Sequence, residues 1–434
     1  MHREFELVSI ALRRNEVSEA RARTNALLRL HPRHPNADLL NGVVARAEGN
    51  LTGSFEILSE LHRRLPLEPA PLIQLASTLN AMGKLDEAIA AYQQVLQQRP
   101  THPDAAFGLG LALKKSQPWR AGPYFLRAAR CQPERVEALH QALRCAMDAV
   151  LRGEPLPTVN VPLPEGGCDT QLVSVICCSV DPARLSRLRE NLATRLENWE
   201  LVHIGDARSL AEAYNRGLER AVGEIIVLCH DDIRILAPDF SSRLRDHLSR
   251  FDIIGVAGSS RCQGPAALWS GPPDSHGWIT YREGNTYLPT IAGAYGPVVA
   301  PAQVLDGVFI AANRNVFSSV RFDETAFDGF HLYDIDFTWR AHTSGLRLAI
   351  CQDLLVEHLS RGDFGSTWQT YAARFRNKFP ELVIVPPTSG PNTFEVAVHT
   401  EDNVRAVYAW MSAWLDELGH GEGFPGAMEG RARG

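Results

Sequence analysis

Hydrophobic and polar positions follow two different patterns along the 434 residues, and the pattern changes near residue 150. Before that point, apolar residues recur at the three- and four-residue spacing of amphipathic helices. After it, short apolar runs at 172–180, 199–204 and 225–229 alternate with helical stretches at 182–196 and 209–222. Alternating strands and helices predict an α/β domain with a parallel sheet.

The first part of the chain contains an internal repeat. Pro32, Pro66, Pro100 and Pro133 end similar stretches at spacings of 34, 34 and 33 residues. Small residues recur between them at constant phase, and these are Gly42, Ala76 and Gly110 in one series and Ala20, Ser54 and Ala88 in another. Small residues let neighbouring helices approach closely, and proline ends a helix. The spacing therefore predicts stacked helical hairpins over 1–150.

This pattern resembles the tetratricopeptide repeat, with its clearest unit at 66–100. Two units depart from it, because Asn15 and Gln117 stand where the turn glycine should be. Solenoids of this type expose a concave groove that can hold a peptide or a helix of a partner. We expect a protein or peptide partner at 1–150, and a dimerisation or purely structural role is the alternative.

Other segments complete the domain plan. Residues 151–170 are rich in Pro and Gly and predict a linker before a second domain at 171–385. In 386–434 we expect one amphipathic helix at 402–418 and a tail without fixed structure. Residues 262–301 lack clear periodicity and predict a long loop. Its aromatic residues suit a substrate lid or a sugar platform, or else they cover the sheet, and these are Trp269, Trp278, Tyr281 and Tyr295.

Composition narrows the classes of partner. The net charge of −6 gives no support for nucleic acid as the main partner, which usually requires a basic face, and no polybasic segment suits an anionic membrane. No apolar run is long enough for a membrane span, and the charged first residues lack the core of a signal peptide. The eight cysteines show no zinc-type spacing. These features predict a cytoplasmic protein without structural zinc.

The main candidate for chemistry is His230-Asp231-Asp232, which directly follows the apolar run 225–229. Open α/β sheets bind ligands where their strands end. Two adjacent carboxylates there are costly unless a cation or hydrogen-bond donors compensate them. The motif therefore predicts a ligand or metal site, with a solvated turn as the alternative.

Four segments in order resemble GT-A fold, family two nucleotide-sugar glycosyltransferases. They are VSVICCSVD, AEAYNRGLERAVGEIIVLCHDDI, the FDE and YDID region with its following helix, and LLVEHLSRG. The first acid of the family's usual DxD motif is replaced by His230, as in a His-x-Asp subgroup. The resemblance covers about 171–362. It implies a metal-dependent, inverting transfer of a sugar from a nucleotide-diphosphate donor.

The resemblance also implies roles for individual residues. Asp232 and His358 would bind Mn²⁺ or Mg²⁺, and an imidazole ligand leans toward Mn²⁺. Asp334 would be the base that takes the acceptor's proton. For the nucleotide, the implied residues are Ser179, Asp181, Asn215, Asp231 and Arg361, with Asp231 on the ribose or as a second metal contact and Arg361 on the diphosphate. On the acceptor side or in support of the base, they are Asp306, Gly307, Asp336 and Trp278.

Several functions remain open from the sequence. One is a glycosyltransferase whose repeats recruit a bacterial protein acceptor, such as a flagellin or an adhesin. A second is a transferase of polysaccharide or lipopolysaccharide assembly. A third is an inactive scaffold with a transferase fold. A nucleotidyltransferase is disfavoured because no Gly-rich loop bearing Lys or Arg follows the first strand. A homodimer through the repeats also stays open.

Overall fold

A computed structural model describes residues 2–157, 171–269, 271, 273–293, 295–362, 364–386 and 393–419. Most of the predicted linker and the predicted tail from residue 420 lie outside these residues. The chain divides into two compact units, of which one comprises 1–145 with 417–434 and the other 146–416.

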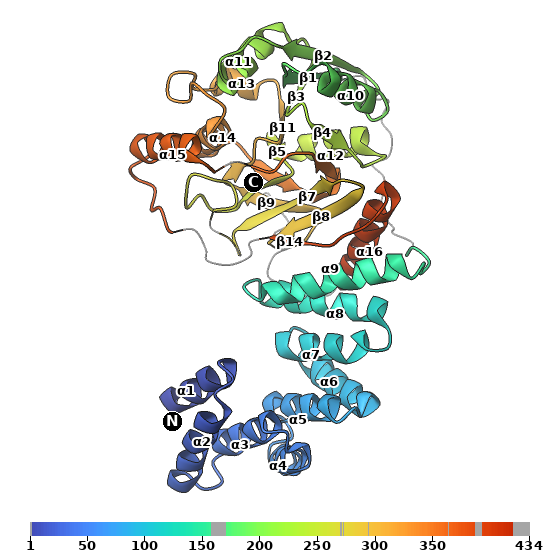
Figure 1. The fold of residues 1–434 in the computed structure, drawn as a ribbon, viewed down its shortest axis with the longest axis vertical. Helices are drawn as coiled ribbons and strands as arrows, with labels where there is room; N and C mark the ends of the chain where they lie inside the picture. The colour runs from blue at the N-terminus through green and yellow to red at the C-terminus, as the bar shows by residue number, and fades with distance from the viewer. Residues whose placement is uncertain are drawn as a thin grey trace, which may run out of the picture. The chain divides into compact units, whose positions relative to one another are not determined.

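The first unit is a series of helices in which consecutive helices pack against each other (Figure 1). The helices are α1 (His2–Arg13), α2 (Val17–Leu30), α3 (Pro35–Ala47), α4 (Leu51–Arg64), α5 (Pro69–Ala81), α6 (Leu85–Gln98), α7 (Pro103–Lys114) and α8 (Pro118–Cys131), and α9 (Val136–Leu151) crosses the division between the units. The predicted hairpins are confirmed.

Small residues let these helices come together as the repeat predicts. A Cβ atom added to Gly42 would lie 2.5 Å from Leu58, and one added to Gly110 would lie 2.7 Å from the Phe125 ring. Asn15 takes φ = 60°, the left-handed conformation that Gly49 adopts at the equivalent turn with φ = 82°. Asparagine tolerates this conformation better than most residues, so it replaces the missing turn glycine.

The α/β unit is built on a seven-stranded sheet with the order β2-β1-β3-β11-β5-β12-β9. The strands are β1 (Val173–Cys178), β2 (Trp199–Ile204), β3 (Ile225–Cys229), β5 (Ile253–Gly255), β9 (Val298–Ala302), β11 (Phe309–Asn313) and β12 (Leu348–Cys351). β1 is parallel to β2 and β3, but β11 is antiparallel to both β3 and β5. The expected parallel pairing holds for the predicted strands β2, β1 and β3, but the sheet as a whole is mixed, because the chain forms a second sheet before β11 and returns in the opposite direction.

The second sheet has the order β10-β6-β7-β13-β4, with β8 on β7 and β14 on β8. Its strands are β4 (Ile233–Ile235), β6 (Ala257–Ser259), β7 (Ser275–Glu283), β8 (Thr286–Ala292), β10 (Val304–Leu305), β13 (Val356–His358) and β14 (Thr393–Glu395). The long loop expected at 262–301 thus contains β7, β8 and β9. Residues 275–280 are all buried, so no alternation of polar and apolar positions marked β7 as a strand.

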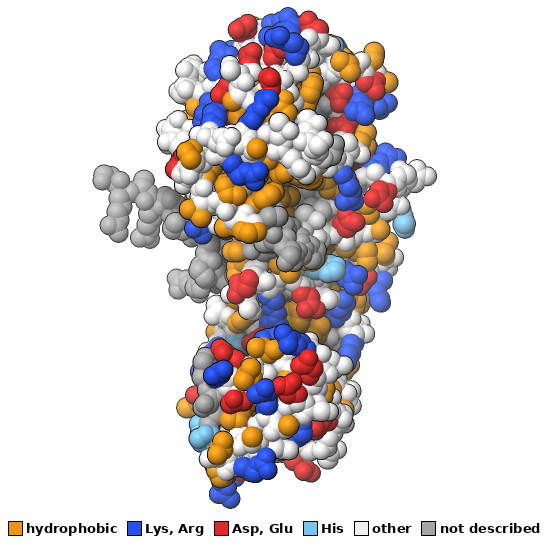
Figure 2. Space-filling model, turned by 60° about the vertical axis from the view of Figure 1, so that its left-hand side comes forward, with side chains coloured by type: hydrophobic (Ala, Val, Ile, Leu, Met, Phe, Trp, Pro, Cys, Tyr) orange, Lys and Arg blue, Asp and Glu red, His pale blue; other side chains and the backbone are white. Residues whose placement is uncertain are grey.

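Helices surround the two sheets (Figure 1). They are α10 (Pro182–Ala193), α11 (Leu210–Arg220), α12 (Phe240–Arg250), the short α13 (Val316–Ser319), α14 (Tyr333–Thr343), α15 (Ser366–Lys378) and α16 (Glu401–Gly419). No helix within the described ranges is long and apolar enough to cross a membrane. On the face shown in Figure 2, acidic and basic side chains are interspersed.

Helix α11 packs closely on β1 at one glycine. A Cβ atom on Gly217 would lie 2.2 Å from Cγ2 of Ile176, so Gly217→Ala forces the helix and strand apart. We expect this change to lower the free energy of unfolding by about 1–3 kcal/mol, the usual cost of overpacking. Thermal unfolding measures the loss. Glu219→Ala, at an exposed position of the same helix, should be close to neutral, and equal stability of the two variants would contradict the tight contact.

Candidate functional site

The His230-Asp231-Asp232 turn lies where β3 ends and β4 begins. β4 pairs antiparallel with β13, and this register sets His358 opposite Ile233. The backbone N–H of Leu359 also donates to the carbonyl oxygen of Asp232, at 3.1 Å. Strand pairing therefore brings His358 to the turn from a distant part of the sequence.

Three side chains at this turn could together hold a metal ion. Nε2 of His358 lies 3.2 Å from Oδ1 of Asp232 and 3.3 Å from Nδ1 of His230. The candidate ligand atoms of all three residues lie within 4.8 Å of one another. His230 is an addition to the predicted pair of Asp232 and His358, and its place in the sequence motif was the available signal.

The charge state of this cluster suits a cation. Oδ2 of Asp232 has no hydrogen-bond partner although the side chain is only 4% exposed. Burial alone would raise the pKa of Asp232, but the hydrogen bond and charge of His358 lower it overall, so the carboxylate is ionised. Burial and then the nearby His358 lower the pKa of His230, which favours the neutral imidazole that metals bind. An orphaned carboxylate oxygen beside two imidazoles fits a divalent metal.

Asp231 faces a different group of residues. The Ser179 hydroxyl donates to Oδ2 of Asp231 at 2.7 Å, which joins the end of β1 to the end of β3. Asp181 caps α10 by accepting from the backbone N–H groups of Ala183 and Arg184, at 2.8 and 3.2 Å. These two backbone hydrogen bonds lower the pKa of the Asp181 carboxyl. The three predicted nucleotide residues therefore lie at one edge of the sheet.

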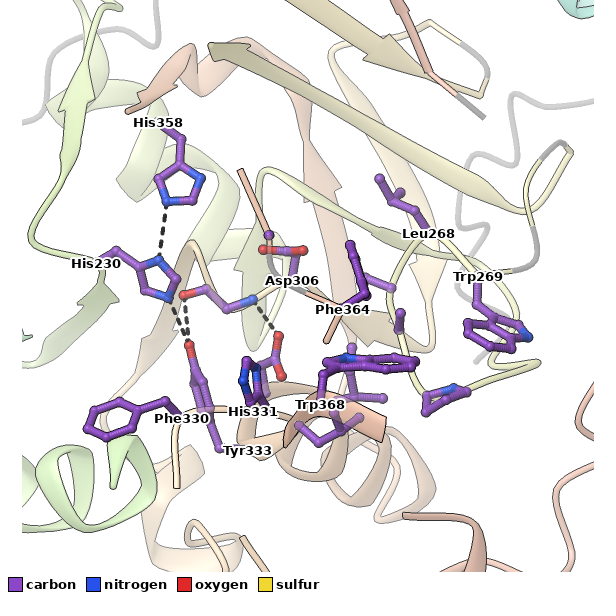
Figure 3. Close-up of a pocket in the computed structure, with 18 of the residues that line it drawn as sticks. His230, Leu268, Trp269, Asp306, Phe330, His331, Tyr333, His358, Phe364 and Trp368 are labelled. Atoms are coloured by element: carbon purple, nitrogen blue, oxygen red, sulfur yellow. Dashed lines mark hydrogen bonds between the residues drawn. The ribbon is translucent and has the colours of Figure 1, made fainter. Parts of the chain in front are cut away.

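A cavity of about 440 Å³ opens beside the metal candidates. His230 and His358 lie on one side of it in Figure 3, and Leu268, Trp269 and Trp368 lie opposite. The lining also includes Asp306, Gly307, Tyr281, Phe330, His331, Tyr333, Asp334 and Phe364. Of the residues expected on the acceptor side, Asp306 and Gly307 do line this pocket.

Asp334 is held in the pocket by the backbone. The N–H of Gly307 donates to Oδ2 of Asp334 at 2.8 Å. Burial, and then the charge of Asp306, raise the pKa of Asp334 to about 7. A carboxyl group with that pKa can accept a proton near neutral pH, as a general base must.

Tyr333 links the metal candidates to this carboxyl group. Its hydroxyl lies 3.1 Å from Nε2 of His230 and donates to the carbonyl oxygen of Gly307 at 3.3 Å. A Cβ atom on Gly307 would lie 2.2 Å from the same hydroxyl, so the close approach requires glycine. Tyr333 was absent from the predicted site because its side chain resembles an ordinary core residue in the sequence.

Two predicted residues are bound up in structural contacts elsewhere. Trp278 is fully buried and packs against Tyr295 and Tyr408, and it is not among the residues that line the cavity. Asn215 hydrogen-bonds to the backbone of Phe322 through both ends of its amide, at 2.9 and 3.2 Å. In this structure Trp278 is a core residue and Asn215 binds the backbone of a neighbouring segment. These contacts replace the predicted contacts of Trp278 with the acceptor and of Asn215 with the nucleotide.

Arg361 pairs with two carboxylates beside the pocket. Its guanidinium pairs with Glu283 at 3.4 Å and Glu395 at 3.0 Å, and it lies 4.6 Å from the ring centre of Tyr281 at the pocket. The Arg361 side chain is 51% exposed, so these ion pairs are partly open to solvent. Its role at the diphosphate stays a prediction.

Asp336 faces a different side from Asp334, as expected for residues two positions apart on a helix. It is fully buried and pairs with Arg340 at 2.7 Å and Lys378 at 2.5 Å, which ties α14 to α15. Asp336→Ala should lower the free energy of unfolding by about 1–3 kcal/mol, because it removes the charge-assisted hydrogen bonds that the buried carboxylate accepts from Arg340 and Lys378. Chemical denaturation measures this loss, with exposed Asp402→Ala as the control. A near-neutral effect of Asp336→Ala would contradict the structural role.

The aromatic lining of the pocket comes from separate segments. Trp269 and Trp368 stack with ring centres 5.9 Å apart, and Phe364 meets Trp368 edge-on at 5.2 Å. Trp368 lies on the pocket side of α15, while Tyr371 and Phe375 of that helix are buried.

A second group of possible ligands lies in the core of the α/β unit. His247, Cys351 and Asp353 are all buried and close together. Nε2 of His247 lies 2.8 Å from Asp353, and Arg243 pairs with the same carboxylate at 3.0 Å. Since the charge of Asp353 is already compensated, this group is a structural network.

Comparisons with known proteins agree with this architecture. Residues 176–376 match the family model described as a glycosyltransferase like family. Residues 5–69 match a tetratricopeptide repeat model, and residues 76–117 match a TPR repeat model. No curated protein matches the chain.

Among solved structures, the chain is similar to MamA 41-end from Desulfovibrio magneticus RS-1, with 16% identity and a TM-score of 0.28 over 35% of this chain and 84% of that chain. It is also similar to TTC0263, a thermophilic TPR protein in Thermus thermophilus, with 20% identity and a TM-score of 0.29 over 34% and 80%. From the family models and the fold, the chain joins N-terminal tetratricopeptide repeats to a glycosyltransferase-like domain.

Proposed function

We propose that the protein is a metal-dependent, inverting glycosyltransferase that moves a sugar from a nucleotide-diphosphate donor to a protein acceptor. The observation that carries the proposal is the shared cavity, which His230 and His358 line together with Asp334. A metal-binding cluster and a base on one pocket are the two parts that such a displacement needs.

The metal part of the proposal rests on the ligand set. Asp232, His358 and His230 would hold the ion, and two imidazoles beside one carboxylate favour Mn²⁺ over Mg²⁺. When bound, a divalent cation supplies positive charge that stabilises the departing diphosphate. Ser179, Asp181 and Asp231 border the same sheet edge and would contact the nucleoside. Membership in a His-x-Asp subgroup stays a prediction.

Asp334 would act on the acceptor. The Gly307 N–H holds the carboxyl group in place through Oδ2, and the carboxylate would take the proton of the acceptor hydroxyl as the hydroxyl oxygen attacks the anomeric carbon. Attack from the face opposite the leaving diphosphate inverts the anomeric centre. Asp306 assists by raising the pKa of Asp334 toward neutrality.

The repeats suggest the acceptor class. Arrays of this kind commonly bind peptides or helices, which favours a protein acceptor such as a flagellin or an adhesin in the bacterial cytoplasm. Assembly of a polysaccharide or lipopolysaccharide is the second candidate, since its chemistry would use the same pocket. An inactive scaffold is disfavoured because the metal candidates and the candidate base lie together.

An acceptor experiment separates these candidates. Removing residues 1–134, which keeps α9 whole, should spare donor hydrolysis but reduce transfer to a protein acceptor by at least about tenfold, since the local concentration of acceptor is lost. Radiolabelled donor sugar follows both reactions. Undiminished protein transfer after the deletion would rule out the recruitment role, and donor hydrolysis reports whether the remaining domain is intact.

A further inference from the structure

Arg184 is the cation that lies against the predicted metal and nucleotide residues. Its Nη1 atom is 3.4 Å from Oδ1 of Asp231 and 3.9 Å from Oδ2 of Asp232, and its Nε is 3.6 Å from Oδ2 of Asp181. Within the described part of the chain, no other lysine or arginine pairs with Asp231 or Asp232. One guanidinium thus compensates three carboxylates of the candidate site.

The contact with Asp232 is loose. Oδ2 of Asp232 has no hydrogen-bond partner, and 3.9 Å is too long for a hydrogen bond from Arg184. The Arg184 side chain is 44% exposed, whereas that of Asp232 is only 4% exposed. Arg184 is therefore a half-exposed charge beside a buried one, and its guanidinium can leave without breaking a close contact to Asp232.

A divalent cation on Asp232 would change the balance at Arg184. The ion and the guanidinium are both positive and use the same carboxylates, so binding of one disfavours binding of the other. A nucleoside diphosphate that arrives with the metal brings new negative charge to this edge of the sheet. Arginine recognises phosphate through paired N–H donors, and this makes the diphosphate the natural partner of a displaced Arg184.

We propose that Arg184 has two positions: it neutralises Asp231 and Asp232 in the free protein, and it holds the donor's diphosphate once a metal occupies the site. This inference rests on the proposed function. It makes Arg184 a donor-binding residue that competes with the metal alone but cooperates with the metal and diphosphate together.

The proposal predicts two effects of opposite sign for Arg184→Ala. The variant should bind Mn²⁺ alone about two- to fivefold more tightly, as expected from losing partly exposed competing ion pairs. At saturating Mn²⁺ it should bind the nucleoside diphosphate about 10- to 100-fold more weakly, because a charge-assisted contact to phosphate is lost. Arg184→Lys keeps the charge and should fall between the variant and the wild type in both measurements.

Calorimetry on the full chain provides both values, first with Mn²⁺ alone and then with whichever of UDP, GDP, CDP and dTDP binds best. Arg189→Ala, an exposed change on the same helix, is the matched control and should change neither affinity. Weaker binding of both ligands by Arg184→Ala would mean that Arg184 only organises the carboxylates, and this overturns the proposal. Unchanged diphosphate affinity would overturn it as well. If the wild type itself bound no Mn²⁺, the proposed function would fail first.

Discussion

Asp232→Asn is expected to abolish sugar transfer while the protein stays folded. The change keeps the shape of the side chain but removes the buried negative charge on which the metal cluster depends. Metal stabilisation of a leaving group contributes several kcal/mol, so we expect a loss of about 10³-fold or more in kcat. Donor turnover and Mn²⁺ calorimetry measure the two consequences separately.

The matched control is Asp206→Asn, which removes an exposed carboxylate that pairs with Arg216 outside the pocket. It should keep both Mn²⁺ binding and turnover. The metal assignment would be contradicted if Asp232→Asn bound Mn²⁺ as tightly as the wild type does. Circular dichroism of both variants distinguishes loss of the site from loss of the fold.

Asp334→Asn is expected to lower the rate of sugar transfer strongly without lowering the stability of the fold above pH 7. Loss of the base should lower kcat by about 10²- to 10⁴-fold, the usual contribution of proton transfer to a positioned side chain. The wild-type rate should rise with pH toward a plateau above about pH 7, because Asp334 acts as a base only after it loses its proton. The variant should show a low rate without this rise. A pH–rate profile of each protein measures the difference.

The raised pKa of Asp334 makes the folded protein less stable as the pH rises, whereas it makes the reaction faster. The folded-state pKa of Asp334 is about 7, above the unfolded value near 4, so the folded state holds a proton that the unfolded state releases. The contribution of this carboxyl group to the free energy of unfolding is fully present below about pH 4 and is lost as the pH rises through about 7. Asp334→Asn cannot ionise and should be as stable as the wild type or more stable above pH 7. Wild-type activity in this variant would exclude Asp334 as the base.

Asp306→Asn refines this assignment. It removes the charge that helps to raise the pKa of Asp334, so the rising limb of the pH–rate profile should move to lower pH. An unchanged pH–rate profile would mean that Asp306 does not influence the pKa of Asp334. Removal of this repulsion between the two carboxylates should raise the stability of the folded state above about pH 7, where Asp334 is ionised.

The chain's own pattern predicts the parts of the fold that local sequence determines. The repeat spacing, the strand 225–229 and the polar turn at its end all follow from periodicity and residue type. His358 was also predicted as a ligand from the order of motifs, and the pairing of β13 with β4 explains its place beside Asp232. Such features depend on few long-range contacts.

The rest of the site depends on which segments meet in space. Tyr333, Arg184 and the Trp269–Trp368 pair acquire their positions from packing between distant elements, and their residue types alone are ordinary. Asn215 is the opposite case. Its residue type and its helix predicted a contact with the nucleotide, but its amide hydrogen-bonds to the backbone of Phe322. The different directions of Asp334 and Asp336, by contrast, follow from helix geometry alone, because residues two positions apart on a helix do not face the same side.

The most direct test of the proposed function is a thermal-shift measurement of the wild type and Asp232→Asn with UDP, GDP, CDP and dTDP, each with and without Mn²⁺. Ligands that bind the folded state raise the melting temperature to an extent set by their affinity and concentration. We predict that one nucleotide raises the Tm of the wild type only with Mn²⁺, and that this shift disappears in Asp232→Asn. The absence of a metal-dependent shift with all four nucleotides in a well-folded wild type would contradict the proposed function.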